Sequence, residues 1–536
     1  MTAFSLTLDR VTSTLPDGRV LFSELSATFD TTRVGLVGRN GVGKSVLARL
    51  LAGHLAPAAG HVQRQGHVHL LAQHSGVIPG RIADLAGVAP LLDALARIEA
   101  GHVDPADFAT VGDRWDIRER LHAQWQRLGL PALDPAQPAA RLSGGQAMQV
   151  ALAGALLSDA DALVLDEPSN HLDAAHRQRL IDALAQWRGG LIVISHDRAL
   201  LRQMQRIVEL GPAGLRSYGG NYDLYAEQKQ AEQSAAEAAL LLRKRERRQE
   251  QAALREQRER LEHRQSRAQR DARTANQAPI LLGGMKNRAE HSAGRMQAQQ
   301  LARRAVADQR VRDAAADIDD AVQIAMLGPR LAAPGPQQVA ELSSVQLPWV
   351  QAPWQHIDLR IQRGDRIGVR GRNGSGKSTL LRVLAGELTP LAGQVNRAAS
   401  VALLDQHLSA LPAHETALGL LQRANPPASE ASLRTQLALL GLDADRSLRP
   451  LSTLSGGERV KAALAAVLYA QAPPQLLVLD EPGNHLDLPS LTALEQMLNQ
   501  YPGSVVIVSH DQALLDALQL THLLDADEDG WQLRRL

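Results

Sequence analysis

A twelve-residue loop occurs twice in this chain of 536 residues, once near each end. The first copy reads GLVGRNGVGKSV, at 35–46, and the second reads GVRGRNGSGKST, at 368–379. Each contains the pattern G-x-x-x-x-G-K-[ST] between an apolar strand-like run and a helix-like run, which is the context of a phosphate-binding P-loop. Glycines let the backbone approach a phosphate closely, and the following helix adds its positive N-terminal end. The duplication predicts two α/β nucleotide-binding domains.

Both loops supply candidate nucleotide ligands. Lys44 and Lys377 are expected to reach the β- and γ-phosphates, and the hydroxyls of Ser45 and Ser378 to ligate Mg²⁺. Only six lysines occur among 58 basic residues, so finding two of them here indicates function. The predicted nucleotide-binding residues of the two loops are Gly38, Arg39, Asn40, Gly41, Val42, Gly43, Lys44 and Ser45, and Gly371, Arg372, Asn373, Gly374, Ser375, Gly376, Lys377, Ser378 and Thr379.

Further motifs repeat in the same order on both flanks. Gln73 in LLAQH and Gln406 in LLDQH are 333 residues apart, as are the two P-loop lysines. The later motifs LSGGQ/LSGGE, LVLDEPSNHLD/LVLDEPGNHLD and the histidines His196/His510 are 312 or 314 apart. The first copy therefore carries 21 extra residues, which fall around 88–126 and have a helical composition.

Each repeated motif has its own chemistry. The apolar strand LVLDE delivers Asp166 or Asp480 to Mg²⁺, and Glu167 or Glu481 follows, where it could orient or deprotonate the attacking water. These acids could instead belong to a helix N-cap region. The histidines could contact the γ-phosphate or be structural. The two glutamines are further candidate nucleotide and Mg²⁺ ligands, so the predicted catalytic residues are Glu167, Glu481, His196 and His510, and the predicted metal ligands are Ser45, Ser378, Gln73, Gln406, Asp166 and Asp480.

The motif LSGG offers a hydroxyl and a helix N-terminus to a second phosphate group. Its alternative is an ordinary helix cap. The predicted phosphate-contacting residues are Ser143, Gly144, Gly145 and Gln146 in the first copy, and Ser455, Gly456, Gly457 and Glu458 in the second.

Between the two flanks the chain is basic and helix-prone. Residues 243–312 hold 19 Lys and Arg against 8 Asp and Glu, a balance of +11 in a chain whose net charge is +1. The spacings of Leu254, Leu261 and Ala268, and of Val311, Ala315, Ile318, Val322 and Ala325, predict two long helices packed as an antiparallel hairpin. The turn is expected in residues 276–295, where proline and glycines interrupt the helix.

Composition excludes several classes of protein. There is no cysteine, so disulfides, a thiolate zinc site and a cysteine nucleophile are impossible. No apolar run reaches the length of a membrane span, and the start MTAFSLTLDR lacks the features of a signal peptide. We therefore expect a cytoplasmic protein.

The motifs and their order resemble those of the ATP-binding cassette family. The family's order is Walker A, Q-loop, signature, Walker B, D-loop and H-loop, and the full set occurs in each flank. The resemblance implies an ATPase whose two domains close head to tail around two ATP molecules. One nucleotide would then be shared by Lys44, Gln73, Asp166, Glu167 and His196 with Ser455 and Gly457, and the other by Lys377, Gln406, Asp480, Glu481 and His510 with Ser143 and Gly145.

Narrower features resemble the ABC-F group: SNHLD and GNHLD after the Walker B acids, YGGNYDLY at 218–225, and tandem cassettes joined by a charged helical linker. The resemblance implies a cassette at 1–225, a linker at 226–335 and a cassette at 336–536. It further implies ATP and Mg²⁺ as cofactors and a monomer that closes on itself and binds the ribosome, its linker contacting tRNA and rRNA. The roles left open are general translation control, rescue of stalled ribosomes and antibiotic resistance.

The two copies also depart from each other. Val46 stands where Thr379 offers a hydroxyl to the α-phosphate, and Leu15 and Pro16 stand where Trp349 could stack on adenine. The first site is therefore expected to bind ATP less tightly. Two other classes remain as alternatives: the ATPase subunit of a membrane transporter, and a DNA-associated cassette ATPase.

Overall fold

The computed structural model describes residues 4–15, 17–72, 79–170, 172–274, 301–313, 336–406, 408–409, 411–484 and 486–536. The chain divides into two compact units. One comprises Met1–Tyr225 together with Gln323–Leu536, and the other is Ala226–Val322. The predicted domain boundaries at 225/226 and 335/336 stay predictions.

The first flank forms one α/β cassette. Its strands are β1 (Ser5–Thr14), β2 (Val20–Phe29), β3 (Arg33–Gly38), β4 (Ala59–Gln65), β5 (Val68–Leu71), β6 (Ala162–Asp166), β7 (Gly190–Ile194), β8 (Arg206–Gly211) and β9 (Gly214–Gly219). Its helices are α1 (Lys44–Leu51), α2 (Ile82–Leu85), α3 (Ala89–Glu99), α4 (Pro105–Val111), α5 (Ile117–Leu128), η1 (Ala139–Arg141), α6 (Gly144–Leu157), α7 (Ala174–Ala185) and α8 (Arg198–Leu201).

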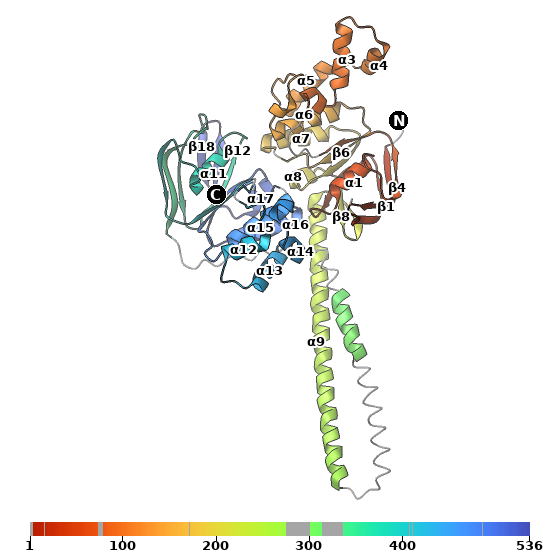
Figure 1. Ribbon diagram of the computed structural model, residues 1–536, viewed down its shortest axis with the longest axis vertical. Coiled ribbons are helices and arrows are strands. Elements are labelled where there is room, and N and C mark those ends of the chain that lie inside the picture. Colours follow the sequence, from red (N-terminus) through yellow and green to blue (C-terminus); the bar gives the residue numbers. More distant parts are fainter. Residues whose placement is uncertain are drawn as a thin grey trace. The chain divides into compact units, whose positions relative to one another are not determined.

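The second flank repeats this plan (Figure 1). Its strands are β10 (Gln338–Gln346), β11 (His356–Gln362), β12 (Arg366–Gly371), β13 (Ala392–Arg397), β14 (Val401–Leu404), β15 (Leu476–Asp480), β16 (Ser504–Val508), β17 (His522–Asp527) and β18 (Gly530–Arg535). Its helices are α11 (Lys377–Ala385), α12 (Ala417–Ala424), α13 (Glu430–Leu439), α14 (Ala444–Ser447), η2 (Leu451–Thr453), α15 (Gly456–Leu468), α16 (Leu488–Gln500) and α17 (Gln512–Ala517).

Each cassette contains a six-stranded sheet and a three-stranded antiparallel sheet. The large sheets have the orders β5-β6-β7-β3-β8-β9 and β14-β15-β16-β12-β17-β18, and their first five strands are parallel. Because ligands bind outside the carboxyl ends of such strands, this topology determines where the predicted motifs meet. Strands β6 and β15 are buried at every residue, as expected of central parallel strands, and both end at the predicted aspartate.

The expected extra residues of the first cassette are helical. Helices α3, α4 and α5 occupy this region, and their apolar faces bury Leu95, Leu121 and Trp125. The second cassette has the two helices α12 and α13 in the corresponding place.

The linker unit contains the predicted long helix. Helix α9 (Tyr222–Thr274) starts four residues before the predicted boundary, and a second helical segment covers 301–313. Arg247 and Asp308 join the two segments at 3.5 Å, and Ala307 is buried. The predicted tip and most of the predicted apolar seam lie outside the described residues and side chains. Among the helices that are described, none has the length and apolarity needed to cross a membrane.

Candidate functional site

Both P-loops have the conformation expected of an anion cradle. Gly43 and Gly376 cap helices α1 and α11 with φ of 105° and 89°, a left-handed backbone that glycine adopts without strain. The ammonium of Lys44 donates to the carbonyls of Gly38 and Arg39 at 2.7 and 3.1 Å, and Lys377 does the same in its own loop at 2.8 and 2.9 Å. Both lysines are buried, and burial lowers their pKa against the opposing pull of nearby carboxylates.

The strand-end aspartates lie beside the P-loop serines. Ser45 donates to Asp166, and Ser378 donates to Asp480. Burial raises the pKa of each aspartate, whereas the serine hydroxyl and the P-loop lysine oppose that rise. Each cassette thus brings together two of the three side chains that were predicted to ligate Mg²⁺.

The two glutamates after these aspartates share an unusual backbone. Glu167 and Glu481 have φ of 51° and 50°, and their N–H groups are anchored to strand carbonyls at 2.8 and 3.0 Å. Left-handed backbone at a residue other than glycine stores strain and is concentrated at functional sites. Burial raises the pKa of both glutamates to about 8, which is the range of an effective general base.

Each glutamate faces the predicted histidine. The Nε2 of His196 is 3.5 Å from Oε1 of Glu167, and the Nε2 of His510 is 3.6 Å from Oε1 of Glu481. Burial and the neighbouring P-loop lysine lower the pKa of both histidines to about 3, so both imidazoles are neutral at pH 7. In the second cassette the ring also contacts Oδ1 of Asn373 at 3.2 Å.

The LSGG serines cap their helices. Ser143 and Gln146 form a capping box at the start of α6, and Ser455 and Glu458 form one at the start of α15. The alternative of an ordinary helix cap is therefore correct as local structure. It leaves the helix N-terminus available as an anion site, because the backbone N–H groups of the glycines follow directly.

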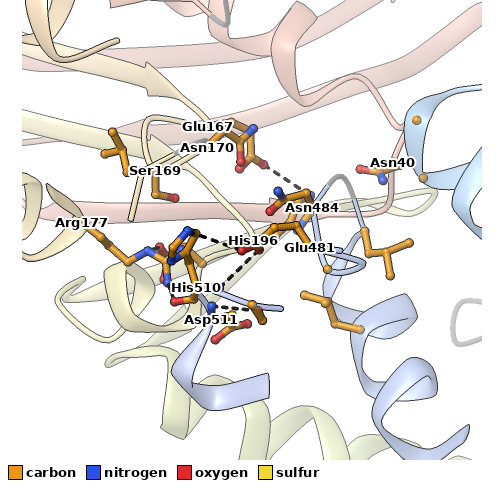
Figure 2. A pocket seen from close by; sticks show the side chains of 18 of the residues that line it. Asn40, Glu167, Ser169, Asn170, Arg177, His196, Glu481, Asn484, His510 and Asp511 are labelled. Atoms are coloured by element: carbon orange, nitrogen blue, oxygen red, sulfur yellow. Dashed lines mark hydrogen bonds and ion pairs between the residues drawn. The ribbon is translucent and has the colours of Figure 1, made fainter. Parts of the chain in front are cut away.

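One cavity of about 250 Å³ contains groups from both cassettes (Figure 2). The first cassette contributes Asn40 and Gly41 from its P-loop, and the second contributes Ser455, Gly456 and Gly457. Both glutamates and both histidines also line it. The remaining lining residues that carry a polar side chain are Ser169, Asn170, Arg177, Asp197, Asn484, Ser509 and Asp511.

Two aspartates make reciprocal contacts across the cassettes. Asp487, in the second cassette, accepts the N–H of Asn40 at 3.0 Å, and Asp173, in the first, accepts the N–H of Asn373 at 3.3 Å. Burial alone would raise the pKa of Asp487, but the Lys461 ammonium and further hydrogen bonds outweigh it and hold the value at about 2. Hydrogen bonds likewise outweigh burial at Asp173 and lower its pKa. Each P-loop is thereby held by a carboxylate from the other cassette.

Another contact between the cassettes has no counterpart at the matching positions of the repeat. Arg198 donates to Glu495 at 2.6 Å, and these side chains are 9% and 12% exposed. The matching positions, 314 residues away, are Gln512 and Ile181, which cannot form an ion pair. Arg198 also hydrogen-bonds Tyr222, the first residue of the linker helix.

Three predicted residues stand apart from this arrangement. Gln73 lies outside the described residues, and Gln406 is partly buried in a turn after β14. Trp349 is 83% exposed, with φ of 57°, and the next residue, Val350, packs against the P-loop glycine Gly376.

The residue of the first cassette that corresponds to Trp349 follows from the strand register. In the two small sheets, Thr12 pairs with Ala59 and Gln346 pairs with Ala392. Thr12 therefore corresponds to Gln346, and Leu15 corresponds to Trp349. This place in the first cassette has no aromatic residue.

Several residues that join the two cassettes were not predicted from the sequence. Asp173 and Asp487 had a usable signal, because both end the repeated string NHLD. Arg177 and Arg198 had none, since leucine and glutamine occupy the matching positions.

Comparisons with known proteins agree with this geometry. The family model described as ABC transporter matches residues 24–170 and 354–484. The probable ATP-binding protein YheS of Escherichia coli K12 is 32% identical over 94% of this chain and 77% of its own length. The tylosin resistance ATP-binding protein TlrC of Streptomyces fradiae is also 32% identical, over 95% of both chains.

Solved structures show the same fold. An archaeal ribosome recycling factor, crystallised with a ribosomal stalk protein, aligns with a TM-score of 0.59 over 98% of this chain and 89% of its own, at 19% identity. An RNase-L inhibitor aligns equally well over 90% of its chain. The duplicated cassettes and the relatives that match nearly all of this chain together establish that it is an ATPase of the ABC-F family of ATP-binding cassette proteins.

Proposed function

We propose that this ATPase acts on the ribosome, with ATP held between its two cassettes and the basic linker contacting tRNA and rRNA. The observation that carries the ATP part is the cavity in which Asn40 and Gly41 of one cassette lie with Ser455, Gly456 and Gly457 of the other. An anion there would meet a P-loop on one side and a helix N-terminus on the other. Hydrolysis would release one of these contacts and let the cassettes separate.

The chemistry follows from the groups beside each P-loop. Glu167 and Glu481 are the proposed bases for the attacking water, since both have a raised pKa and a strained backbone. His196 and His510 are the proposed contacts to the transferred phosphate, because a neutral imidazole can donate a hydrogen bond without repelling Mg²⁺. The phosphate charge would be balanced by Lys44 or Lys377.

Mg²⁺ fits the oxygen groups at each P-loop. A buried aspartate hydrogen-bonded to a serine hydroxyl is a pair of hard oxygen ligands, and Mg²⁺ is held by such groups together with phosphate oxygens. Ser45 with Asp166 and Ser378 with Asp480 would hold it, with Gln73 and Gln406 as further proposed ligands. When bound, the ion would neutralise charge on the phosphates.

The linker supports the choice of a nucleic-acid partner. Along α9 and 301–313 the exposed basic residues outnumber the acidic ones, and contacts between such residues and phosphates release counterions. Among the side chains that the structure describes in these helices, the exposed basic ones are Arg243, Lys244, Arg245, Arg248, Arg255, Arg260, Arg267, Arg270, Arg303, Arg304, Arg310 and Arg312. A ribosomal partner would place the protein in the cytoplasm.

Ribosome pelleting tests this function. Glu167→Gln with Glu481→Gln should keep ATP bound without hydrolysis, so we expect the double variant to pellet with ribosomes in ATP at low salt and to detach at high salt. Wild type with ADP is the control. A double variant that binds ATP but stays in the supernatant at low salt would contradict the ribosome assignment and favour a transporter or DNA partner.

A matched pair of charge variants tests the linker. Changing Lys244, Arg245 and Arg248 to Gln should weaken ribosome binding and lower the slope of log affinity against log salt by about one for each phosphate that is no longer neutralised. The control removes equal charge from the first cassette, at the exposed residues Arg127, Arg179 and Arg188. Equal slopes for the two triple variants would contradict a role for the linker in binding RNA.

Antibiotic resistance is the role that we propose within this function. The tylosin resistance relative matches over 95% of both chains, so the two proteins share nearly all of their length. Expression in a susceptible bacterium should raise the tylosin concentration needed to stop growth, and the double Glu→Gln variant should not. Unchanged susceptibility at confirmed expression would favour general translation control or rescue of stalled ribosomes.

A further inference from the structure

Arg177 lies between the two cassettes and contacts both. It is in the first turn of α7, and its side chain is 15% exposed. Its Nε is 2.9 Å from Oδ2 of Asp197, in its own cassette, and its Nη1 donates to the carbonyl of His510, in the other, at 2.6 Å. Figure 2 shows the side chain of Arg177 extending toward His510. One guanidinium therefore joins the segments that follow β7 and β16.

The two residues that Arg177 contacts, Asp197 and His510, differ in the hydrogen bonds that fix them. Asp197 caps α8, where its Oδ1 accepts the N–H groups of Ala199 and Leu200. The main chain of His510 has a looser attachment, since its N–H donates to Glu481 at 3.3 Å. A guanidinium anchored at one end by a fixed carboxylate presents its other N–H groups in a fixed direction. The contact with the His510 carbonyl thus positions His510, whose ring lies against Glu481.

The second cassette provides the internal comparison. Leu491 occupies the position that matches Arg177 and is buried, with an exposed fraction of 3%. A leucine has no donor, so it cannot hold the His196 carbonyl in the way that Arg177 holds that of His510. This contact therefore serves one ATP site and has no counterpart at the other.

We propose that Arg177, a residue of the first cassette, is a positioning residue for ATP hydrolysis at the Glu481 site of the second. It acts by fixing the main chain of His510, and so the placement of Glu481 and the histidine ring. The proposal rests on the proposed roles of these two residues in hydrolysis. Hydrolysis at the Glu481 site then depends on Arg177. The Glu167 site has no such positioning residue, because leucine occupies the matching position.

Single-turnover hydrolysis of ATP in two backgrounds tests the proposal. Glu167→Gln leaves only the Glu481 site able to hydrolyse, and Glu481→Gln leaves only the Glu167 site. Arg177→Leu copies the residue at the matching position, and we expect it to slow hydrolysis about tenfold in the first background and less than about twofold in the second. The ATP concentration that gives half the maximal rate should change less than about twofold in both, because Arg177 contacts the hydrolytic side of the site.

Three further variants keep the test decisive. Arg177→Lys should recover part of the rate, because one ammonium can keep one contact but cannot reproduce the fork. Arg177→Gln replaces Arg177→Leu if the leucine variant does not fold. Arg179→Leu, at an exposed position of the same helix, is the control and should leave both rates unchanged.

The possible results separate the two proposals. Equal slowing in both backgrounds, or slowing only of the Glu167 site, would overturn the positioning role of Arg177, as would unchanged rates in both. If the double Glu→Gln protein hydrolyses ATP at the wild-type rate, the proposed bases are wrong whatever Arg177 does.

Discussion

The two ATP sites share their central groups and differ around them. Both have a P-loop lysine, a strand-end aspartate, a strained glutamate and a neutral histidine in nearly the same geometry. The surrounding positions have diverged. Matched pairs that differ include Val46 and Thr379, Leu15 and Trp349, Arg177 and Leu491, Arg198 and Gln512, Ile181 and Glu495, and Gln149 and Lys461.

This difference shows which parts of a duplicated site are free to change. The groups that contact phosphate are constrained by one reaction, so both copies keep them. The groups that contact adenine or the other cassette are less constrained, because each cassette faces a different sequence in the other. We therefore expect two sites that hydrolyse ATP by the same chemistry but differ in their affinity for ATP and in the contacts that they receive from the other cassette.

The largest effect is expected from the shared lysines. Lys44→Ala or Lys377→Ala removes a buried positive charge from the phosphate site, and steady-state ATP turnover should fall about 100-fold in either variant. Both composite sites are then needed for turnover. A near-normal rate in one of the two variants would show that its site is dispensable and that the shared groups are not equivalent.

The one-sided ion pair should give the next largest effect. Arg198→Gln introduces the residue of the matching position and leaves Glu495 buried without its partner, so we expect a loss of about 3 kcal/mol in the free energy of unfolding. Urea denaturation measures it. Adding Glu495→Gln should recover most of the loss, whereas two additive losses would mean that the pair does not act as a unit.

The reciprocal aspartates should differ in the same assay. The pKa of Asp487 is held at about 2, below its ordinary 3.8, which corresponds to about 2 kcal/mol of stability at neutral pH. Asp487→Asn should remove this stability together with the attraction between Asp487 and Lys461. Asp173→Asn should remove less, because Gln149, at the position matching Lys461, carries no charge.

The pH dependence checks the sign of this prediction. A folded-state pKa below the unfolded one stabilises the fold above about pH 4, and the contribution disappears as the pH falls through about 2. The difference between wild type and Asp487→Asn should therefore shrink from about pH 5 to about pH 2. A constant difference over this range would assign the loss to packing and not to charge.

The central groups of both sites could be predicted from sequence because each motif is local. A P-loop, or a buried strand ending in Asp-Glu, is a pattern of adjacent residues whose spacing determines its geometry. The left-handed backbone of Glu167 and Glu481 could not be predicted, since it depends on how the chain leaves a buried strand. Arg177 could not be predicted either, because its partner His510 is 333 residues away and nothing in the local pattern marks it.

The two ATP sites differ most clearly at the positions that would contact adenine, in both sequence and structure. Trp349 is exposed beside the residue that packs on the second P-loop, whereas the first cassette has Leu15 at this place and Val46 in place of a hydroxyl. Loss of an aromatic stack and of a hydroxyl contact each costs on the order of 1 kcal/mol. We expect the site at Lys44 to bind ATP about tenfold or more weakly than the site at Lys377.

Titration of ATP into the two single-site variants measures this inequality most directly. Lys377→Ala leaves the weaker site and Lys44→Ala leaves the stronger one, and both titrations are made with the glutamates changed to glutamine so that no ATP is consumed. The predicted result is a dissociation constant at least about tenfold higher for Lys377→Ala than for Lys44→Ala. Equal constants, or tighter binding in Lys377→Ala, would contradict the view that the two sites share their chemistry but not their affinity.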